Sequence, residues 1–144
     1  MSQIEAVFQV LGGSTVVGPA PESLHQIQER LEEGLPYAAL EALTERLELS
    51  QGEVLSSLAL TARTLARRKK EHRLHAVESD RLYRVARITA RAFDVFGDEE
   101  KARRWLHKPN RSLGGKVPLE LLTTDVGAQH VDDILGRIEH GIPS

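Results

Sequence analysis

Residues 50–68 of this 144-residue chain, SQGEVLSSLALTARTLARR, contain the signals for two short helices joined by a tight turn. Ser50 is a good N-cap, and Glu53 stands three positions later, where its side chain completes a capping box. Thr61 offers a second N-cap after only a short connection. Ala59 is small enough for the turn between them. The stretch therefore predicts a helix-turn-helix unit.

The charges change sign along this unit. From Glu22 to Glu53, eight acidic residues stand against only Arg30 and Arg46. The second helix and its exit then carry six basic residues, opposed by Glu71 alone. Because DNA binding requires clustered cations that neutralise phosphates, the pattern predicts a unit whose second helix enters the major groove of DNA.

The predicted DNA contacts divide by role along the second helix. Arg63, Thr64 and Arg67 are the candidates for base contacts, since arginine can hold guanine with two hydrogen bonds. The cations from Lys69 to Arg73 are expected on phosphates, which position the protein without specifying sequence. The full predicted set is Gln51, Thr61, Arg63, Thr64, Arg67, Arg68, Lys69, Lys70 and Arg73.

The rest of the chain is also predicted to be helical, except for its start. From Glu22 onwards, apolar residues recur every three or four positions, and Gly34 and Gly97 separate successive helices. Residues 1–21 contain several glycines and prolines, so we expect a flexible N-terminal tail or arm, with at most a short strand around Ile4–Leu11. The predicted fold class is all-α.

Composition excludes several function classes. The chain has no cysteine, which excludes disulfides and thiolate metal sites and favours a cytoplasmic location. No apolar run approaches the roughly 20 residues that cross a bilayer, so no membrane partner is expected. His72 and His75 lack a nearby third ligand, so no metal site is expected either. No serine stands in a nucleophile-elbow motif, and the carboxylates do not form a pair in apolar surroundings. We therefore expect no catalytic residue, no cofactor and no enzyme activity.

The densest motif lies in the last third of the chain. It runs Trp105-Leu106-x-x-Pro109-Asn110-x-x-Leu113-Gly114-Gly115-x-x-Pro118-Leu119-x-Leu121-Leu122-x-Thr124-x-x-Gly127 and continues into an apolar helical repeat that ends at Gly141. Trp105 would supply a large apolar anchor with one hydrogen-bond donor. The two consecutive glycines permit backbone angles that a side chain would forbid.

This motif resembles the toxin-binding domain of the Xre/MbcA/ParS antitoxins, over roughly Ser79 to Gly141. The preceding part, Leu35 to Arg73, is similar to the Xre-like helix-turn-helix of the same proteins. The resemblance implies an N-terminal Xre-like helix-turn-helix bundle followed by a small helical toxin-binding domain. The expected segments are a tail (1–21), an Xre-like DNA-binding domain (22–75) and a toxin-binding domain (76–144).

The resemblance also implies a function. Family members bind a toxin of the RES type, which degrades NAD, block its active site and repress their own operon. The expected partners are therefore a cognate RES-type toxin, operator DNA and a second copy of the chain, as a homodimer within a larger toxin–antitoxin complex.

Two groups of residues are expected at the toxin. The first matches the family motif and is expected partly to shape the fold: Trp105, Pro109, Asn110, Leu113, Gly114, Gly115, Pro118 and Leu119. The second lies on the C-terminal helix and its end, Val131 to Ser144, where Arg137, Glu139 and His140 offer polar contacts.

Two other functions fit the same residues. One is a stand-alone transcription regulator whose C-terminal half oligomerises or binds another partner. The other is an interaction scaffold with a vestigial helix-turn-helix, because Leu55 stands where such motifs commonly have a small residue and Ala59 replaces the common turn glycine.

Overall fold

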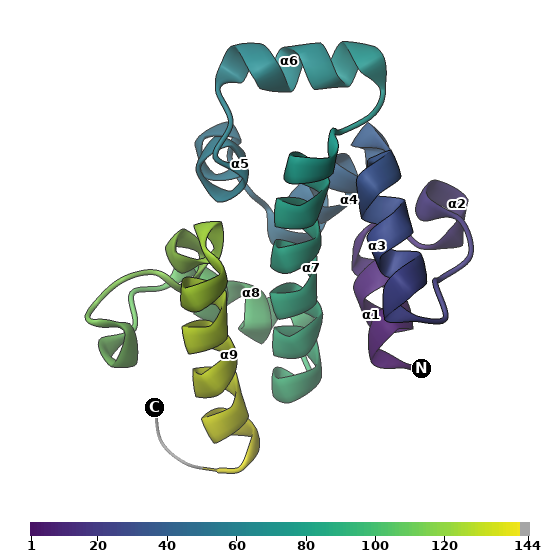
Figure 1. The fold of residues 1–144 in the computed structure, drawn as a ribbon. Coiled ribbons are helices and arrows are strands. Elements are labelled where there is room, and N and C mark those ends of the chain that lie inside the picture. The colour runs from purple at the N-terminus through teal and green to yellow at the C-terminus, as the bar shows by residue number, and fades with distance from the viewer. Residues whose placement is uncertain (142–144) are drawn as a thin grey trace.

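A computed structural model describes residues 1–141, which fold into α-helices, two 3-10 helices and two isolated β-bridges (Figure 1). The elements in chain order are α1 (Gln3–Val10), α2 (Ser14–Val17), α3 (Leu24–Glu33), α4 (Tyr37–Leu47), α5 (Gln51–Leu58), α6 (Ala62–Glu71), α7 (Ala76–Phe96), α8 (Glu99–His107), η1 (Arg111–Leu113), η2 (Pro118–Thr123) and α9 (Asp125–Glu139). The all-α prediction is confirmed. Within this described part, no helix has the length and apolar character needed to cross a membrane.

The long helix α7 is the centre of the fold. In Figure 1 it stands between α1 and α3 on one side and α9 on the other, while α6 lies across its beginning. It contacts α1, α3, α5, α8, α9 and η2. Leu82, Val85, Ala86 and Ile88 are almost completely buried along it. One continuous core therefore serves both the helix-turn-helix region and the C-terminal helices.

The expectation of a flexible N-terminal tail is wrong. Ile4, Val7, Phe8 and Leu11 follow the spacing of one helical face, and three of them are buried in the core, Leu11 completely. The Ser2 hydroxyl accepts a hydrogen bond from the Glu5 amide and so caps α1. The glycines do not interrupt this helix because they follow it.

Phe8 provides a direct test of the packed N-terminus. We expect Phe8→Ala to lower the free energy of unfolding by about 3–5 kcal/mol, because it empties a volume enclosed by the core. The exposed neighbour substitution Gln9→Ala should change stability by less than about 0.5 kcal/mol. Chemical denaturation measures both values, and equal small effects would mean that this segment does not belong to the core.

Two linkers pair with each other beneath α6. The Leu74 amide donates to the Leu35 carbonyl at 2.9 Å, and the Tyr37 amide donates to the His72 carbonyl at 3.0 Å. Gly34 has φ +93°, and a Cβ there would lie 2.1 Å from the Leu74 carbonyl oxygen. Only glycine allows this approach. The pairing anchors the chain at the end of α6.

The start of α7 is joined to the linker that precedes α4. Helix α7 begins at Ala76 with His75 in the cap position, so Ser79 does not cap the helix. Ser79 is instead fully buried within the helix, where its hydroxyl accepts a 2.8 Å hydrogen bond from the Leu35 amide. A buried serine thus ties α7 to the linker before α4.

Candidate nucleic-acid and protein interfaces

The predicted helix-turn-helix forms as α5 and α6. Ser50 and Glu53 make both bonds of the capping box at the start of α5. Ala59 ends α5 with φ 52°, in the left-handed region that most turns of this kind reserve for glycine. The Thr61 hydroxyl then accepts from the Thr64 amide at 3.1 Å and caps α6.

The outer face of α6 carries three cations that form no ion pair within the described residues 1–141. Arg63, Arg67 and Lys70 are exposed and spaced four and three residues apart, so they share one face of the helix. Thr64 is half-buried, and its hydroxyl accepts a hydrogen bond from that of Thr61. The structure therefore brings three of the predicted DNA contacts together on one exposed face.

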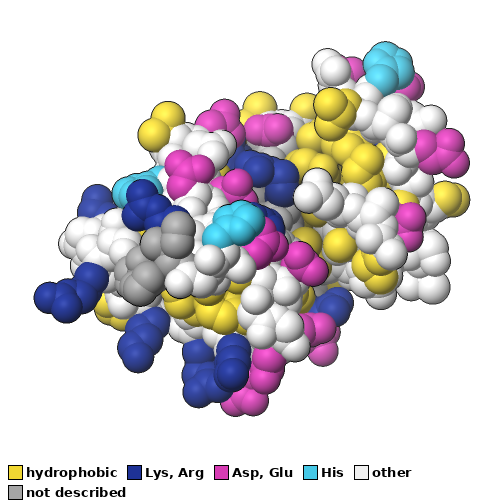
Figure 2. All heavy atoms as spheres, turned by 90° about the horizontal axis from the view of Figure 1, so that it is seen from below, with side chains coloured by type: hydrophobic (Ala, Val, Ile, Leu, Met, Phe, Trp, Pro, Cys, Tyr) yellow, Lys and Arg dark blue, Asp and Glu magenta, His cyan; other side chains and the backbone are white. Residues whose placement is uncertain are grey.

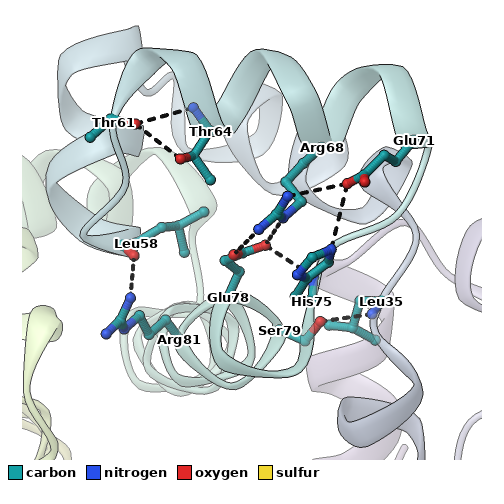
Figure 3. Close-up of polar contacts among 10 residues, drawn as sticks. All are labelled: Leu35, Leu58, Thr61, Thr64, Arg68, Glu71, His75, Glu78, Ser79 and Arg81. Carbon is teal, nitrogen blue, oxygen red and sulfur yellow. Dashed lines mark hydrogen bonds and ion pairs between the residues drawn. The ribbon is translucent and has the colours of Figure 1, made fainter.

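Arg68 does not belong to that surface, and its prediction as a DNA contact is corrected. The side chain is buried, with 6 % of its surface exposed, and its Nε and Nη2 donate to the two carboxylate oxygens of Glu78 at 2.6 and 3.1 Å (Figure 3). Glu71 accepts a third bond at 3.2 Å. Arg68 lies one helical turn after the half-buried Thr64, so it is on the side of α6 that faces α7.

The pKa values of this pair favour the charged forms. Burial raises the pKa of Glu78, but hydrogen bonds from Arg68 and from the His75 amide outweigh it, and the net pKa lies below its ordinary value of 4.5. The hydrogen bond to Glu78 likewise raises the pKa of Arg68. The pair therefore stays ionised around neutral pH although both groups are buried.

The remaining predicted DNA contacts are Gln51, Lys69 and Arg73, and each of them lies beside another element of the fold. A groove of about 520 Å³ separates α4 from α5 and α6, and its lining includes Gln51 and Lys69 together with the acidic Glu41 and Glu45. The Arg73 guanidinium donates to the Gly34 carbonyl at 2.6 Å. It thus strengthens the linker pairing, whereas its phosphate contact stays a prediction.

The Arg68–Glu78 pair generates a test with two parts. Glu78→Leu should cost about 3–5 kcal/mol of stability because it leaves a buried guanidinium without a counter-ion, and the double substitution Arg68→Met/Glu78→Leu should recover most of that loss. As the matched control, Glu99→Gln breaks the exposed Arg46–Glu99 pair and should cost less than about 1 kcal/mol.

The same pair predicts a pH dependence. Because the pKa of Glu78 is lowered in the folded state, its contribution to stability is complete above pH 4.5 and is lost as the pH falls through its folded-state pKa. Urea unfolding between pH 3 and pH 7 should show a shallower acid loss for the double variant than for the wild type. Identical slopes would contradict the assigned pairing.

The glycine-rich loop after α8 is closed by its own backbone. The Asn110 amide donates to the Lys116 carbonyl at 3.0 Å, and the Asn110 side chain accepts from the Ser112 amide at 2.8 Å. Gly114 and Gly115 have φ +67° and +85°, as the motif predicts. Pro109 and both glycines lie at the exposed rim of this loop.

The other motif residues mainly build the core. Leu113, Pro118 and Leu119 are buried, so as toxin contacts they are corrected to residues that shape the fold. Trp105 is half-buried and packs against Phe96 with ring centroids 5.7 Å apart. Part of the indole therefore stays accessible to a partner.

The last helix separates its apolar face from its polar end. Val131, Ile134 and Leu135 are buried, whereas Arg137 and His140 are exposed. The predicted segment Val131 to Ser144 is seen only in part, since residues 142–144 lie outside the described part of the chain.

Glu139 is engaged within the protein. Its carboxylate accepts two hydrogen bonds from Arg91 of α7, at 2.9 and 3.1 Å, and these bonds lower its pKa. The exposed carboxylate is therefore paired within the protein, and its contact with the toxin stays a prediction.

Two residues outside the predicted sets connect the halves of the molecule. His107 of α8 lies 2.7 Å from the Leu47 carbonyl through Nε2 and 3.1 Å from Glu53 through Nδ1. Arg84 of α7 donates to the Thr123 carbonyl and to Asp125, at the start of α9. The sequence signal that could have indicated them is a polar residue next to the buried apolar positions of its helix, as His107 is to Leu106 and Arg84 is to Val85.

Metal chemistry finds no support in the described residues. Within residues 1–141, no three histidine or carboxylate side chains gather in a way that could hold a metal ion.

Comparisons with known proteins match both regions of this fold. Residues 26–87 match the family model of the antitoxin Xre-like helix-turn-helix domain. Residues 91–141 match the model of the antitoxin Xre/MbcA/ParS C-terminal toxin-binding domain. The short gap between the two matches lies within α7, and the predicted domain boundary between residues 75 and 76 stays a prediction.

Curated proteins are similar over most of their length. A protein named Antitoxin Xre from Photorhabdus laumondii is 35 % identical over 132 residues, which cover 90 % of this chain and 88 % of the relative. Another Antitoxin Xre, from Pseudomonas putida, is 40 % identical over 124 residues, covering 85 % of this chain and 77 % of the relative.

Proposed function

This chain belongs to the Xre antitoxin family, and we propose that it inhibits an NAD-degrading RES-type toxin and represses its own operon. It has the helix-turn-helix and toxin-binding domains of that family, which is a class of regulators and inhibitors rather than enzymes. The observation that carries the proposal is the presence of both domains on one chain, built around the single helix α7.

The helix-turn-helix would provide the repression. Arg63, Arg67 and Lys70 form the exposed cationic face of α6, and such a face fits the major groove. A homodimer would place two copies of α6 on half-sites about one helical turn apart. Leu24, whose surface is 82 % exposed at the start of α3, is available for the dimer contact. Repression at the operator places the protein in the cytoplasm.

The C-terminal half would provide the inhibition. Arg137 and His140 are exposed at the end of α9 beside the Glu139 carboxylate, and this carboxylate can compete for the cationic groups with which a toxin binds the phosphates of NAD. The half-buried Trp105 adds an apolar contact. Blocking the substrate pocket by protein contact requires no chemistry from the antitoxin itself.

The repression arm is tested with the double variant Arg63→Ala/Arg67→Ala. If both guanidiniums contact DNA, affinity for the chain's own promoter should fall at least about tenfold, and the slope of log K against log salt should shrink by about 2. The control Lys101→Ala/Lys108→Ala removes the same charge elsewhere and should leave both values unchanged. Fluorescence anisotropy across a salt series measures them, and unaltered promoter binding by the α6 variant would refute the assignment.

The inhibition arm is tested with the RES-domain protein encoded beside this chain's gene. Adding purified antitoxin should abolish NAD cleavage at a stoichiometric ratio, while Arg137→Ala/His140→Ala should weaken inhibition at least about tenfold. The α6 double variant should inhibit like the wild type. A stable complex that still cleaves NAD at the uninhibited rate would rule out occlusion of the active site.

A further inference from the structure

A second run of basic residues lies in the C-terminal half of the chain. From Lys101 to Leu119 there are six lysine and arginine residues and no aspartate or glutamate. Arg103 is the member that is used within the fold, because it pairs with Glu48 at 2.7 Å and donates to the Arg46 carbonyl. The other five side chains are exposed and define what we call the basic face: Lys101, Arg104, Lys108, Arg111 and Lys116.

The fold assembles the basic face from one helix and one closed loop. Lys101 and Arg104 are three residues apart on α8, and Lys108 follows at the end of that helix. The bridge between Asn110 and Lys116 then fixes Lys116 beside the start of the short helix that carries Arg111. Figure 2 shows lysine and arginine side chains gathered on the side of the molecule that carries this loop.

These five cations have no counter-ion among the residues that the structure describes. Within residues 1–141, none of them forms an ion pair with a carboxylate, whereas Arg84, Arg91 and Arg103 nearby each have at least one acidic partner. Concentrating like charges without counter-ions costs electrostatic free energy that an acidic partner would recover. The basic face is therefore suited to binding an acidic partner, and it does not stabilise the fold of this chain.

An aromatic side chain lies at the edge of the basic face. Trp105 is four residues from Lys101 and next to Arg104 on α8, and it is only half-buried. Tryptophan and arginine are the residues that most often carry the binding energy of protein interfaces. A half-exposed indole beside free guanidiniums favours a protein surface as the partner.

The placement of the face argues against the operator duplex. In Figure 1, α6 lies across one end of the molecule, and the loop between α8 and α9 projects from its side, nearer the other end. A straight duplex seated on Arg63, Arg67 and Lys70 of α6 would not follow that loop. The basic face also falls within residues 91–141, which match the toxin-binding domain.

We propose that the basic face docks onto an acidic surface of the toxin, outside the pocket that binds NAD. This inference rests on the proposed antitoxin function and names the chemistry of the partner surface. A site that binds an anionic dinucleotide attracts negative charge, so a cationic face suits a separate acidic region. The face speeds encounter with the toxin and holds the orientation in which the end of α9 reaches the pocket.

The experiment compares two triple variants with equal loss of charge. Arg104→Ser/Lys108→Ser/Arg111→Ser neutralises the basic face, and Arg63→Ser/Arg67→Ser/Lys70→Ser neutralises the outer face of α6. Both sets of side chains are exposed, and thermal unfolding verifies that each variant folds. Stopped-flow mixing with the RES-domain protein encoded beside the gene gives association rates from 20 to about 500 mM salt, and anisotropy with promoter DNA is measured in parallel.

The expected result is specific to one variant. The basic-face variant should associate with the RES-domain protein at least about tenfold more slowly at low salt and with a weaker salt dependence, while its promoter affinity stays unchanged. The α6 variant should show the opposite pattern.

Three outcomes would overturn the proposal. Unchanged association by the basic-face variant would remove this interface and leave the antitoxin function intact. Loss of promoter affinity in that variant equal to the loss in the α6 variant would make the face a nucleic-acid surface. Failure of the wild type to bind the RES-domain protein at all would remove the proposed function and this inference with it.

Discussion

The buried ion pair between Arg68 and Glu78 determines where α6 lies on the rest of the protein. Few side chains of α6 enter the core, Leu65 and Arg68 being the buried ones, so apolar packing alone holds this helix weakly. A bidentate pair adds direction, because both carboxylate oxygens and two guanidinium nitrogens must align at once. Desolvation offsets much of its Coulomb energy, and the pair therefore contributes more to a single orientation of α6 than to net stability.

That orientation is what gives the outer face of α6 its composition. With Arg68 turned inward, Arg63, Arg67 and Lys70 are left together on the opposite side. The backbone pairing of the linkers at Leu35 and Leu74 fixes the end of the same helix, and the Ser79 hydroxyl joins this pairing to α7. A small set of polar contacts thus positions the outer face of α6, although this helix has only one buried apolar side chain, Leu65.

The sequence predicted the elements better than the direction of individual side chains. Capping at Ser50 and Thr61 and the apolar repeat of α9 are local signals, and the corresponding helices formed as expected. Arg68 was misassigned because its partner Glu78 lies on another helix, and a sequence pattern within α6 does not show that contact.

The prediction for the N-terminal segment was wrong for a different reason. Its glycines and prolines outweighed a short apolar repeat that included Val7 and Phe8, although those breakers stand after the helix and not inside it. The sequence alone does not predict the basic face, because its charges are spread over 16 residues, from Lys101 to Lys116, and the loop closure at Asn110 brings their ends together.

The shared helix α7 limits how this antitoxin can be recombined with its relatives. Its 21 residues include Glu78 and Ser79 near its start and Arg84 and Arg91 further along. Both halves of the protein are therefore attached to α7 through hydrogen bonds and ion pairs of this one helix. A chimera cut inside α7 would separate those residues from the partners they evolved with. Exchange of toxin specificity between family members would therefore have to keep α7 together with one parent and redesign its contacts to the other.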